Sequence, residues 1–166
     1  MIMRAKLDII FHVNNPLWKT RLRPYTKTIR QALEIALSET KLKNSENEFE
    51  IAVVLVDDEF MKSLNNKYRS KNKPTNVLSF PASSFPSSLN PQASSLALGD
   101  IILALETIEK EAKEQHKTFR DHSKHLLVHG FLHLLGYDHI SEDQAAIMEN
   151  KEVKILKKLD VNNPYL

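Results

Sequence analysis

Three of the chain's seven histidines, His129, His133 and His139, fall within eleven residues of a largely apolar stretch. Residues four apart project from one face of a helix, so His129 and His133 can both offer ring nitrogens to one ion. Gly136 stands where a helix commonly ends in a left-handed turn, and such a turn would bring His139 back to the same ion. The pattern predicts a metal-binding helix near the C-terminal end.

We expect this helix to be buried, because leucine, valine and phenylalanine surround the histidines between Leu126 and Leu135. Imidazoles on a buried helix need partners, and a cation is one. Three imidazoles leave one tetrahedral position of a zinc ion open, whereas structural zinc sites usually have four protein ligands. An open site lowers the pKa of a bound water, so we predict one Zn²⁺ ion and a hydrolase. Nitrogen ligands also suit copper, nickel or iron.

The bulk composition is that of an ordinary globular protein. The chain has 166 residues, 42% hydrophobic and 27% charged, with a formal net charge of +2 and no cysteine. This predicts a single domain over residues 1–166 and excludes disulfide partners and thiolate zinc sites. No stretch reaches the roughly 18 apolar residues of a membrane span, and the first residues do not read as a signal peptide. We therefore expect a cytoplasmic protein without a membrane partner.

Periodicity places strands near the front and helices at the back, which predicts an α+β fold. We expect Asp58 to cap a short helix, and Ser141 with Gln144 to form a capping box. The serine- and proline-rich stretch 82–95 is predicted to be a mobile loop. The expected strands are 6–13, 49–56, 75–80 and 98–103, and the other expected helices are 24–42, 104–116, 119–135 and 141–158.

Two blocks of sequence resemble one known family. The stretch from His129 to His139 is similar to the motif H-G-x-L-H-L-x-G-Y-D-H of the YbeY family of bacterial rRNA maturation factors. Residues 64–81, with Tyr68-Arg69 and Thr75-Asn-Val-Leu-Ser-Phe-Pro, resemble that family's L-N-x-x-Y-R-x-x-x-x-P-T-D/N-V-L-S-F-P. The resemblance runs from about residue 50 to residue 156.

The resemblance implies a zincin-like α+β fold with a mixed four-stranded sheet packed with helices. It implies a zinc-dependent, single-strand-specific endoribonuclease that processes the 3′ end of small-subunit rRNA and acts in ribosome quality control. The implied metal ligands are His129, His133 and His139, and Arg69 matches the arginine associated with activity. The implied partners are rRNA and the small ribosomal subunit, with ribosomal proteins or an assembly GTPase as further candidates.

A basic segment, residues 60–73, is the candidate RNA contact. It holds five basic residues and no acidic ones, with Tyr68 among them. Basic groups bind phosphates and an aromatic ring can stack a base, although a charged run is commonly a solvated surface. We assign Tyr68, Lys71 and Lys73 to substrate binding. Arg69 either stabilises charge on the scissile phosphate or pairs with Asp57, Asp58 or Asp100.

Several alternatives stay open. His125, one turn before His129, supports the metal ligands from behind, lines the substrate cleft or is a partly exposed side chain. Asp138 orients a ligand imidazole or caps the turn. The attacking group is metal-bound hydroxide or the ribose 2′-OH. Metalloproteases share the spacing H-E-x-x-H-x-x-G-x-x-H, but Gly130 replaces their general base. A non-catalytic ribosome-assembly factor with a structural metal is the other alternative.

Overall fold

The computed structural model describes residues 5–82 and 95–166. Its sheet has four strands in the order β1-β2-β4-β3. Neighbours β1, β2 and β4 are parallel, and the edge strand β3 is antiparallel to β4. The predicted α+β fold with a mixed four-stranded sheet is confirmed. The strands are β1 (Lys6–Val13), β2 (Glu48–Val56), β3 (Val77–Pro81) and β4 (Ser95–Ala104).

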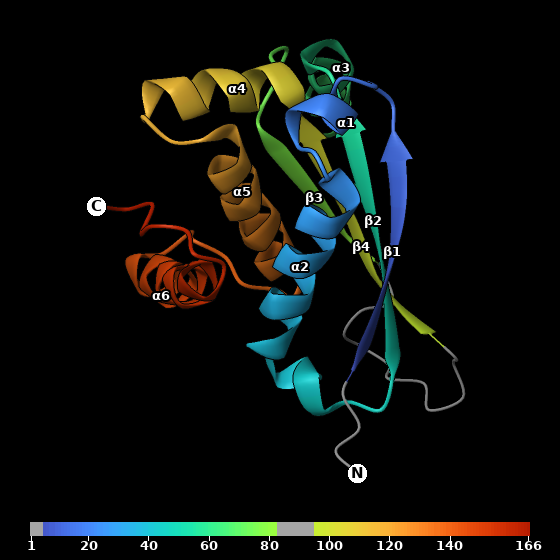
Figure 1. Cartoon of the computed structure of the whole chain (residues 1–166), viewed down its shortest axis with the longest axis vertical. Coiled ribbons are helices and arrows are strands. Elements are labelled where there is room, and N and C mark those ends of the chain that lie inside the picture. Colours follow the sequence, from blue (N-terminus) through green and yellow to red (C-terminus); the bar gives the residue numbers. More distant parts are fainter. Residues whose placement is uncertain (1–4, 83–94) are drawn as a thin grey trace.

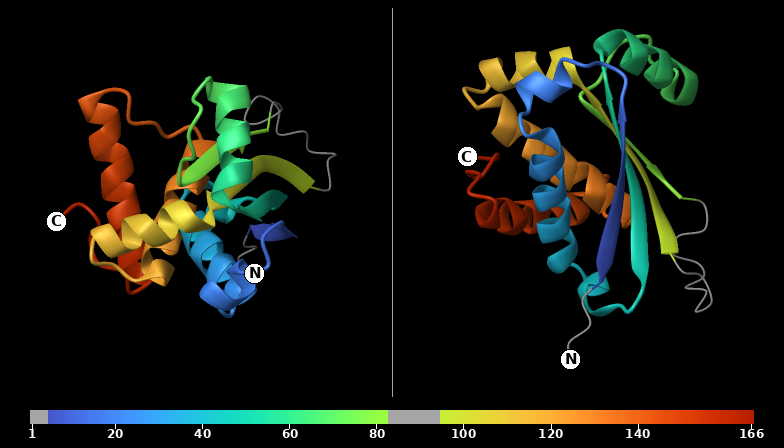
Figure 2. Two further views of the ribbon diagram at one scale, coloured as in Figure 1. Left: turned by 90° about the horizontal axis from the view of Figure 1, so that it is seen from above. Right: turned by 45° about the vertical axis from the view of Figure 1, so that its right-hand side comes forward.

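Helices cover the sheet unequally (Figures 1 and 2). Helices α2 and α5 pack on one face, α6 lies outside α5, and α3 lies on the other side of β3. Helices α1 and α4 lie toward the upper end of the sheet in Figure 1. No helix in the described part of the chain is long and apolar enough to cross a membrane. The helices are α1 (Trp18–Arg21), α2 (Tyr25–Ser38), the 3₁₀ helix η1 (Lys41–Asn44), α3 (Asp58–Arg69), α4 (Leu105–Glu114), α5 (Phe119–Leu134) and α6 (Glu142–Lys158).

The main core forms between the sheet, α2 and α5. Helix α2 buries Ile29, Leu33 and Leu37, each one turn from the next, on the face that meets the core. Helix α5 is buried on several sides, with Phe131 and Leu132 fully inaccessible, as its apolar sequence predicts. The helix that carries the histidines is therefore held in place by packing on several sides.

A smaller core lies on the opposite face of the sheet, where α3 packs. Side chains of a strand alternate between the two faces. Ser79 of β3 accordingly bonds to Gly130 of α5, whereas the neighbouring Phe80 packs with the α3 side. Strand β3 thus separates the two helices that hold the predicted site residues.

Most predicted elements are found, with differences at their ends. Ser141 and Gln144 form the predicted capping box of α6. The predicted N-cap Asp58 is wrong: Asp57 caps α3 by accepting from the Phe60 N–H, because the Asp58 carboxylate instead accepts from the Thr107 N–H and hydroxyl.

Strand β4 begins at Ser95 and is longer than expected, since pairing with β2 extends it beyond its most apolar residues. Helix α2 ends at Ser38 rather than near Leu42, and a 3₁₀ turn follows. The loop predicted at 82–95 falls, for residues 83–94, outside the described residues.

Helix α6 is attached to the end of α2 through Glu39. The Glu39 carboxylate lies 2.8 Å from the Lys154 Nζ and also pairs with Lys158, while Lys151 donates to the Glu39 carbonyl. The bond from Lys154, then that from Lys158, lowers the pKa of Glu39 from 4.5 to about 2. The ionised carboxylate therefore stabilises the docking of α6.

We predict that Glu39→Gln lowers the free energy of unfolding by about 1 kcal/mol at neutral pH, since both lysines are largely exposed. Because the folded-state pKa is depressed, this contribution is present above about pH 4.5 and is lost as the pH falls toward about 2. Urea unfolding of both proteins across this range tests it. Glu34→Gln on the same helix is the control, and an equal effect of the two substitutions would contradict the prediction.

Candidate metal centre

The last two turns of α5 bring His129 and His133 together. Their Nε2 atoms lie 3.1 Å apart. Two donors at about 2.0–2.1 Å from a tetrahedral zinc ion are separated by roughly 3.3 Å, so the observed pair fits one ion. Two nitrogen lone pairs at this distance repel each other unless a proton or a cation lies between them.

Gly136 ends α5 in the predicted way. The Gly136 N–H donates to the His133 carbonyl and the Tyr137 N–H to the Leu132 carbonyl, the two bonds of a Schellman motif. The φ of Gly136 is +90°, and a Cβ there would meet nothing within 4 Å. Glycine is favoured at this position by backbone conformation alone.

The reversed chain returns His139 to the pair. Its ring centroid lies 5.5 Å from that of His129 and 5.1 Å from that of His133. One ligand atom of each of the three residues lies within 4.8 Å of the others. The structure thus brings together the three side chains that the spacing singles out, with His139 the most exposed of them.

Glu152 of α6 contacts Nδ1 of His129, the ring nitrogen that does not face His133. Its Oε1 lies 2.6 Å from the His129 Nδ1, and the residue is fully buried. Burial opposes ionisation, but hydrogen bonds from His129 and Tyr165 outweigh it and lower the pKa of Glu152. An ionised carboxylate only accepts, so His129 carries its proton on Nδ1 and leaves Nε2 free to bind a cation.

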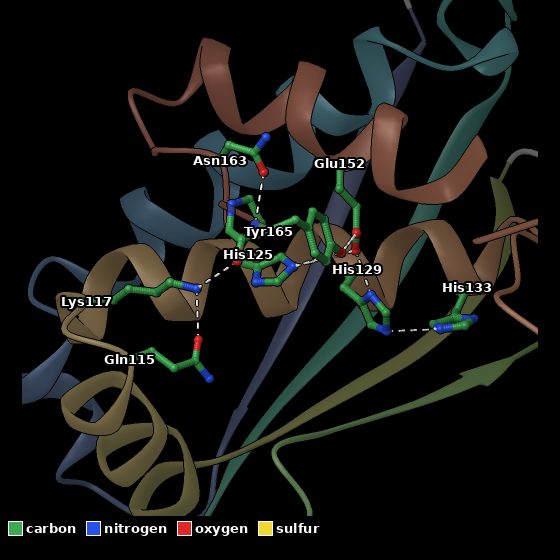
Figure 3. Close-up of polar contacts among 9 residues, drawn as sticks. Gln115, Lys117, His125, His129, His133, Glu152, Asn163 and Tyr165 are labelled. Atoms are coloured by element: carbon green, nitrogen blue, oxygen red, sulfur yellow. Dashed lines mark hydrogen bonds and ion pairs between the residues drawn. The ribbon is translucent and has the colours of Figure 1, made fainter. Parts of the chain in front are cut away.

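Tyr165 and His125 complete the surroundings of Glu152 (Figure 3). The Tyr165 hydroxyl donates to Glu152 Oε2, and its ring meets that of His125 edge-on, with centroids 5.8 Å apart. The side chain of His125 is 14% exposed. Its contact with substrate stays a prediction.

Burial lowers the pKa of two rings of the cluster, His125 and His133. It lowers the pKa of His125 to about 4, so this ring carries no proton charge near neutral pH. Burial, followed by the charges of His129 and His139, also lowers the pKa of His133. Neutral imidazole is the metal-binding form.

Asp138 is placed to cap the turn. Its Oδ1 accepts from the backbone N–H of His139 at 2.8 Å, which restrains the residue that carries the third imidazole. Its charge also raises the pKa of His133 slightly against the stronger effects of burial and the neighbouring rings.

The basic segment lies at the end of α3 and beyond it. Asn65, itself 2% exposed, donates from Nδ2 to the Lys73 carbonyl and so fixes the path of the chain. Tyr68 is 57% exposed, with its ring 5.1 Å from that of Phe80. Lys71 and Lys73 are exposed.

Arg69 is exposed in the last turn of α3. It forms no ion pair with a carboxylate of the described residues. The alternative pairing with Asp57 or Asp58 is absent there, because those carboxylates accept from Phe60 and Thr107. Among the described residues, no hydrogen bond or ion pair joins Arg69 to the histidines. Strand β3 lies between α3 and α5 (Figure 2).

Gly130 lets α5 approach the sheet. A Cβ there would lie 3.0 Å from the Ser79 Oγ and 3.1 Å from Ile101 Cγ2, and the Ser79 hydroxyl donates to the Gly130 carbonyl. At the position that carries the general base in metalloproteases, this helix packs closely against β3 and β4, which favours a residue without a side chain. The metal-binding geometry is kept while that base is lost.

One residue of the site, Glu152, was not singled out from the sequence. Glu152 occupies a buried position in the stripe Met148, Glu152, Ile155 and Leu156, and an acid in such a stripe signals a buried partner. Outside this site, Glu111 binds the buried His122 at 2.7 Å and Asn76 at 2.9 Å. That second network ties α4 and α5 to the chain entering β3.

A mixed sheet with three imidazoles gathered at the end of a central helix defines a zincin-like α+β protein. The model of the family described as Endoribonuclease YbeY matches residues 12–160. The Endoribonuclease YbeY of Agrobacterium fabrum is 42% identical over 164 residues, which are 97% of this chain and 96% of that protein. That of Bartonella quintana is 43% identical over 159 residues, covering 96% and 97%. The chain belongs to the YbeY endoribonuclease family.

A solved structure shares the fold. The solution structure of TM1509 from Thermotoga maritima superposes with a TM-score of 0.53 at 22% identity, covering 92% of both chains. At this identity the likeness concerns the architecture alone. It agrees with the zincin-like α+β prediction.

We predict that Gly136→Ala lowers the free energy of unfolding by about 1–2 kcal/mol, the cost of a left-handed conformation for a residue with a Cβ. Because an added Cβ meets nothing within 4 Å, the loss is conformational and not steric. Gly136→Asn is the matched variant and should lose less, since asparagine tolerates this region. Chemical denaturation measures both, and equal losses would argue against the turn as the cause.

Proposed function

We propose that this protein is a zinc-dependent endoribonuclease that cuts single-stranded RNA. Membership of the family supports the class of reaction. The observation that supports metal dependence is the 3.1 Å approach of two imidazole Nε2 atoms, with one ring held by a buried carboxylate. Nitrogen donors alone do not select zinc over copper or nickel, so the choice of zinc rests on its availability and on the family resemblance.

His129, His133 and His139 would hold the ion. Bound there, zinc supplies a Lewis acid next to a phosphodiester. Glu152 keeps the His129 Nε2 unprotonated, and Asp138 restrains the backbone of His139. The low pKa values of His133 and His125 keep these rings uncharged near neutral pH.

The edge strand β3 gives a physical reason for single-stranded RNA. The histidines lie on the α5 side of this strand and the basic segment on the α3 side. An extended RNA chain that crosses the β3 edge can place one phosphate near the metal centre and others near Arg69, Lys71 and Lys73. The exposed ring of Tyr68 offers a surface on which a base can stack. A rigid duplex is wider and less able to bend across such an edge.

We further propose rRNA of the small ribosomal subunit, near its 3′ end, as the substrate, and the cytoplasm as the place of action. A role in ribosome quality control, with ribosomal proteins or an assembly GTPase as partners, belongs to the same proposal. A metallopeptidase is disfavoured by the packing of Gly130 against Ser79 and Ile101.

We predict that His133→Ala reduces cleavage of single-stranded RNA by about a hundredfold or more. Loss of a group that hydrogen-bonds to a metal ligand lowers metal affinity or activity about 10–100-fold, and loss of a ligand itself should lower activity by at least the upper value. Cleavage of an end-labelled RNA and zinc content measure the effect. The matched control is His12→Ala, because His12 is an exposed residue of β1. A zinc-loaded His133→Ala protein that cuts at the wild-type rate would falsify the nuclease assignment.

Arg69→Ala should lower kcat/KM for RNA by about 10²–10³-fold, as expected when a donor to a charged transition state is removed. Zinc affinity should not change, because no hydrogen bond or ion pair joins Arg69 to the three histidines. Arg69→Lys should recover only part of the loss, since lysine cannot bind two phosphate oxygens in one plane. Lys62→Ala on the same helix is the control. If it matches Arg69→Ala, the segment contributes charge alone.

A further inference from the structure

The chain beyond α6 folds back over the buried carboxylate of the metal centre. Lys124 Nζ donates to the Leu159 carbonyl at 3.1 Å, and the Tyr165 N–H donates to Asn163 Oδ1 at 2.9 Å. These bonds bring the Tyr165 side chain to α5, beside His125 and Glu152 (Figure 3). We define residues 159–166 as the C-terminal segment.

Each oxygen of Glu152 has its own donor. Oε1 accepts from His129 Nδ1 at 2.6 Å and Oε2 accepts from the Tyr165 hydroxyl. Glu152 is 0% exposed, so water cannot readily replace a missing donor. Burial, followed by the bond to Glu152, raises the pKa of Tyr165 above its ordinary value, and the phenol therefore stays a donor.

A competing partner is close to the same carboxylate. His125 Nε2 lies 3.8 Å from Glu152 Oε1 and 3.5 Å from the Tyr165 oxygen. Without the hydroxyl, Glu152 Oε2 has no hydrogen-bond donor. A small rotation of the carboxylate group could then move the carboxylate toward His125 and away from His129. Retaining both donors selects the orientation that faces His129.

We propose that Tyr165 is a positioning residue of the metal centre, which acts through Glu152 to hold His129 in its Nδ1–H tautomer with Nε2 free. The C-terminal segment is then part of the site although no hydrogen bond joins it to His129, His133 or His139. This inference rests on the proposed three-histidine site.

The test compares Tyr165→Phe with wild type in the full chain. The substitution keeps the ring against His125 and removes only the hydroxyl. We expect zinc affinity, measured by competition with a chromophoric chelator, to fall about tenfold. In ¹⁵N-labelled metal-free protein, the Nδ1–H signal of His129 should broaden or exchange faster. Tyr25→Phe, in a ring pair with Phe11, is the matched control and should change neither.

A double-mutant cycle separates positioning from general stability. In a Glu152→Gln background, Tyr165→Phe should cause no further loss of zinc affinity, because the path through the carboxylate is already broken. Unchanged affinity in Tyr165→Phe, or the same loss in both backgrounds, overturns the inference. If wild type itself does not bind zinc, or binds it as well after His133→Ala, the metal site fails instead.

Discussion

A single buried hydrogen bond between two helices connects the folding of this protein to its chemistry. Glu152 belongs to α6 and His129 to α5, and the 2.6 Å contact between them exists only when α6 is docked. A buried carboxylate without a partner is costly, so the bond favours one arrangement of the two helices. The same bond determines which nitrogen of His129 is available. The packing of the two helices and the tautomer of His129 therefore depend on the same interaction.

Local parts of the site could be predicted from the sequence, and long-range parts could not. The spacing of His129 and His133 and the glycine turn depend on residues one turn apart, where helix geometry alone decides. The bond to Glu152 joins residues 23 apart in the chain, and only the packing of α6 brings them together. The choice of Asp57 over Asp58 as N-cap likewise depended on Thr107, a residue 49 positions away.

The comparison with metalloproteases acquires a physical basis at Gly130. The spacing of the three histidines is a requirement of the ion, so unrelated chemistries can share it. The residue after the first histidine is free of that requirement, and here its lack of a side chain permits helix-to-sheet contact. The fold therefore has a histidine arrangement that could hold a metal ion, with a helix-to-sheet contact where metalloproteases have a glutamate.

The order of the elements along the chain has a consequence for biosynthesis. Ribosomes make α5 before α6, so the histidine pair leaves the ribosome ahead of the carboxylate and the tyrosine hydroxyl that surround it in the folded protein. A nascent chain that has not yet released residues 142–165 has an apolar α5 without its outer cover and a His129 without its acceptor. His129 therefore gains its bond to Glu152, and Glu152 its bond to Tyr165, only after α6 and the C-terminal segment have been made and have packed against α5.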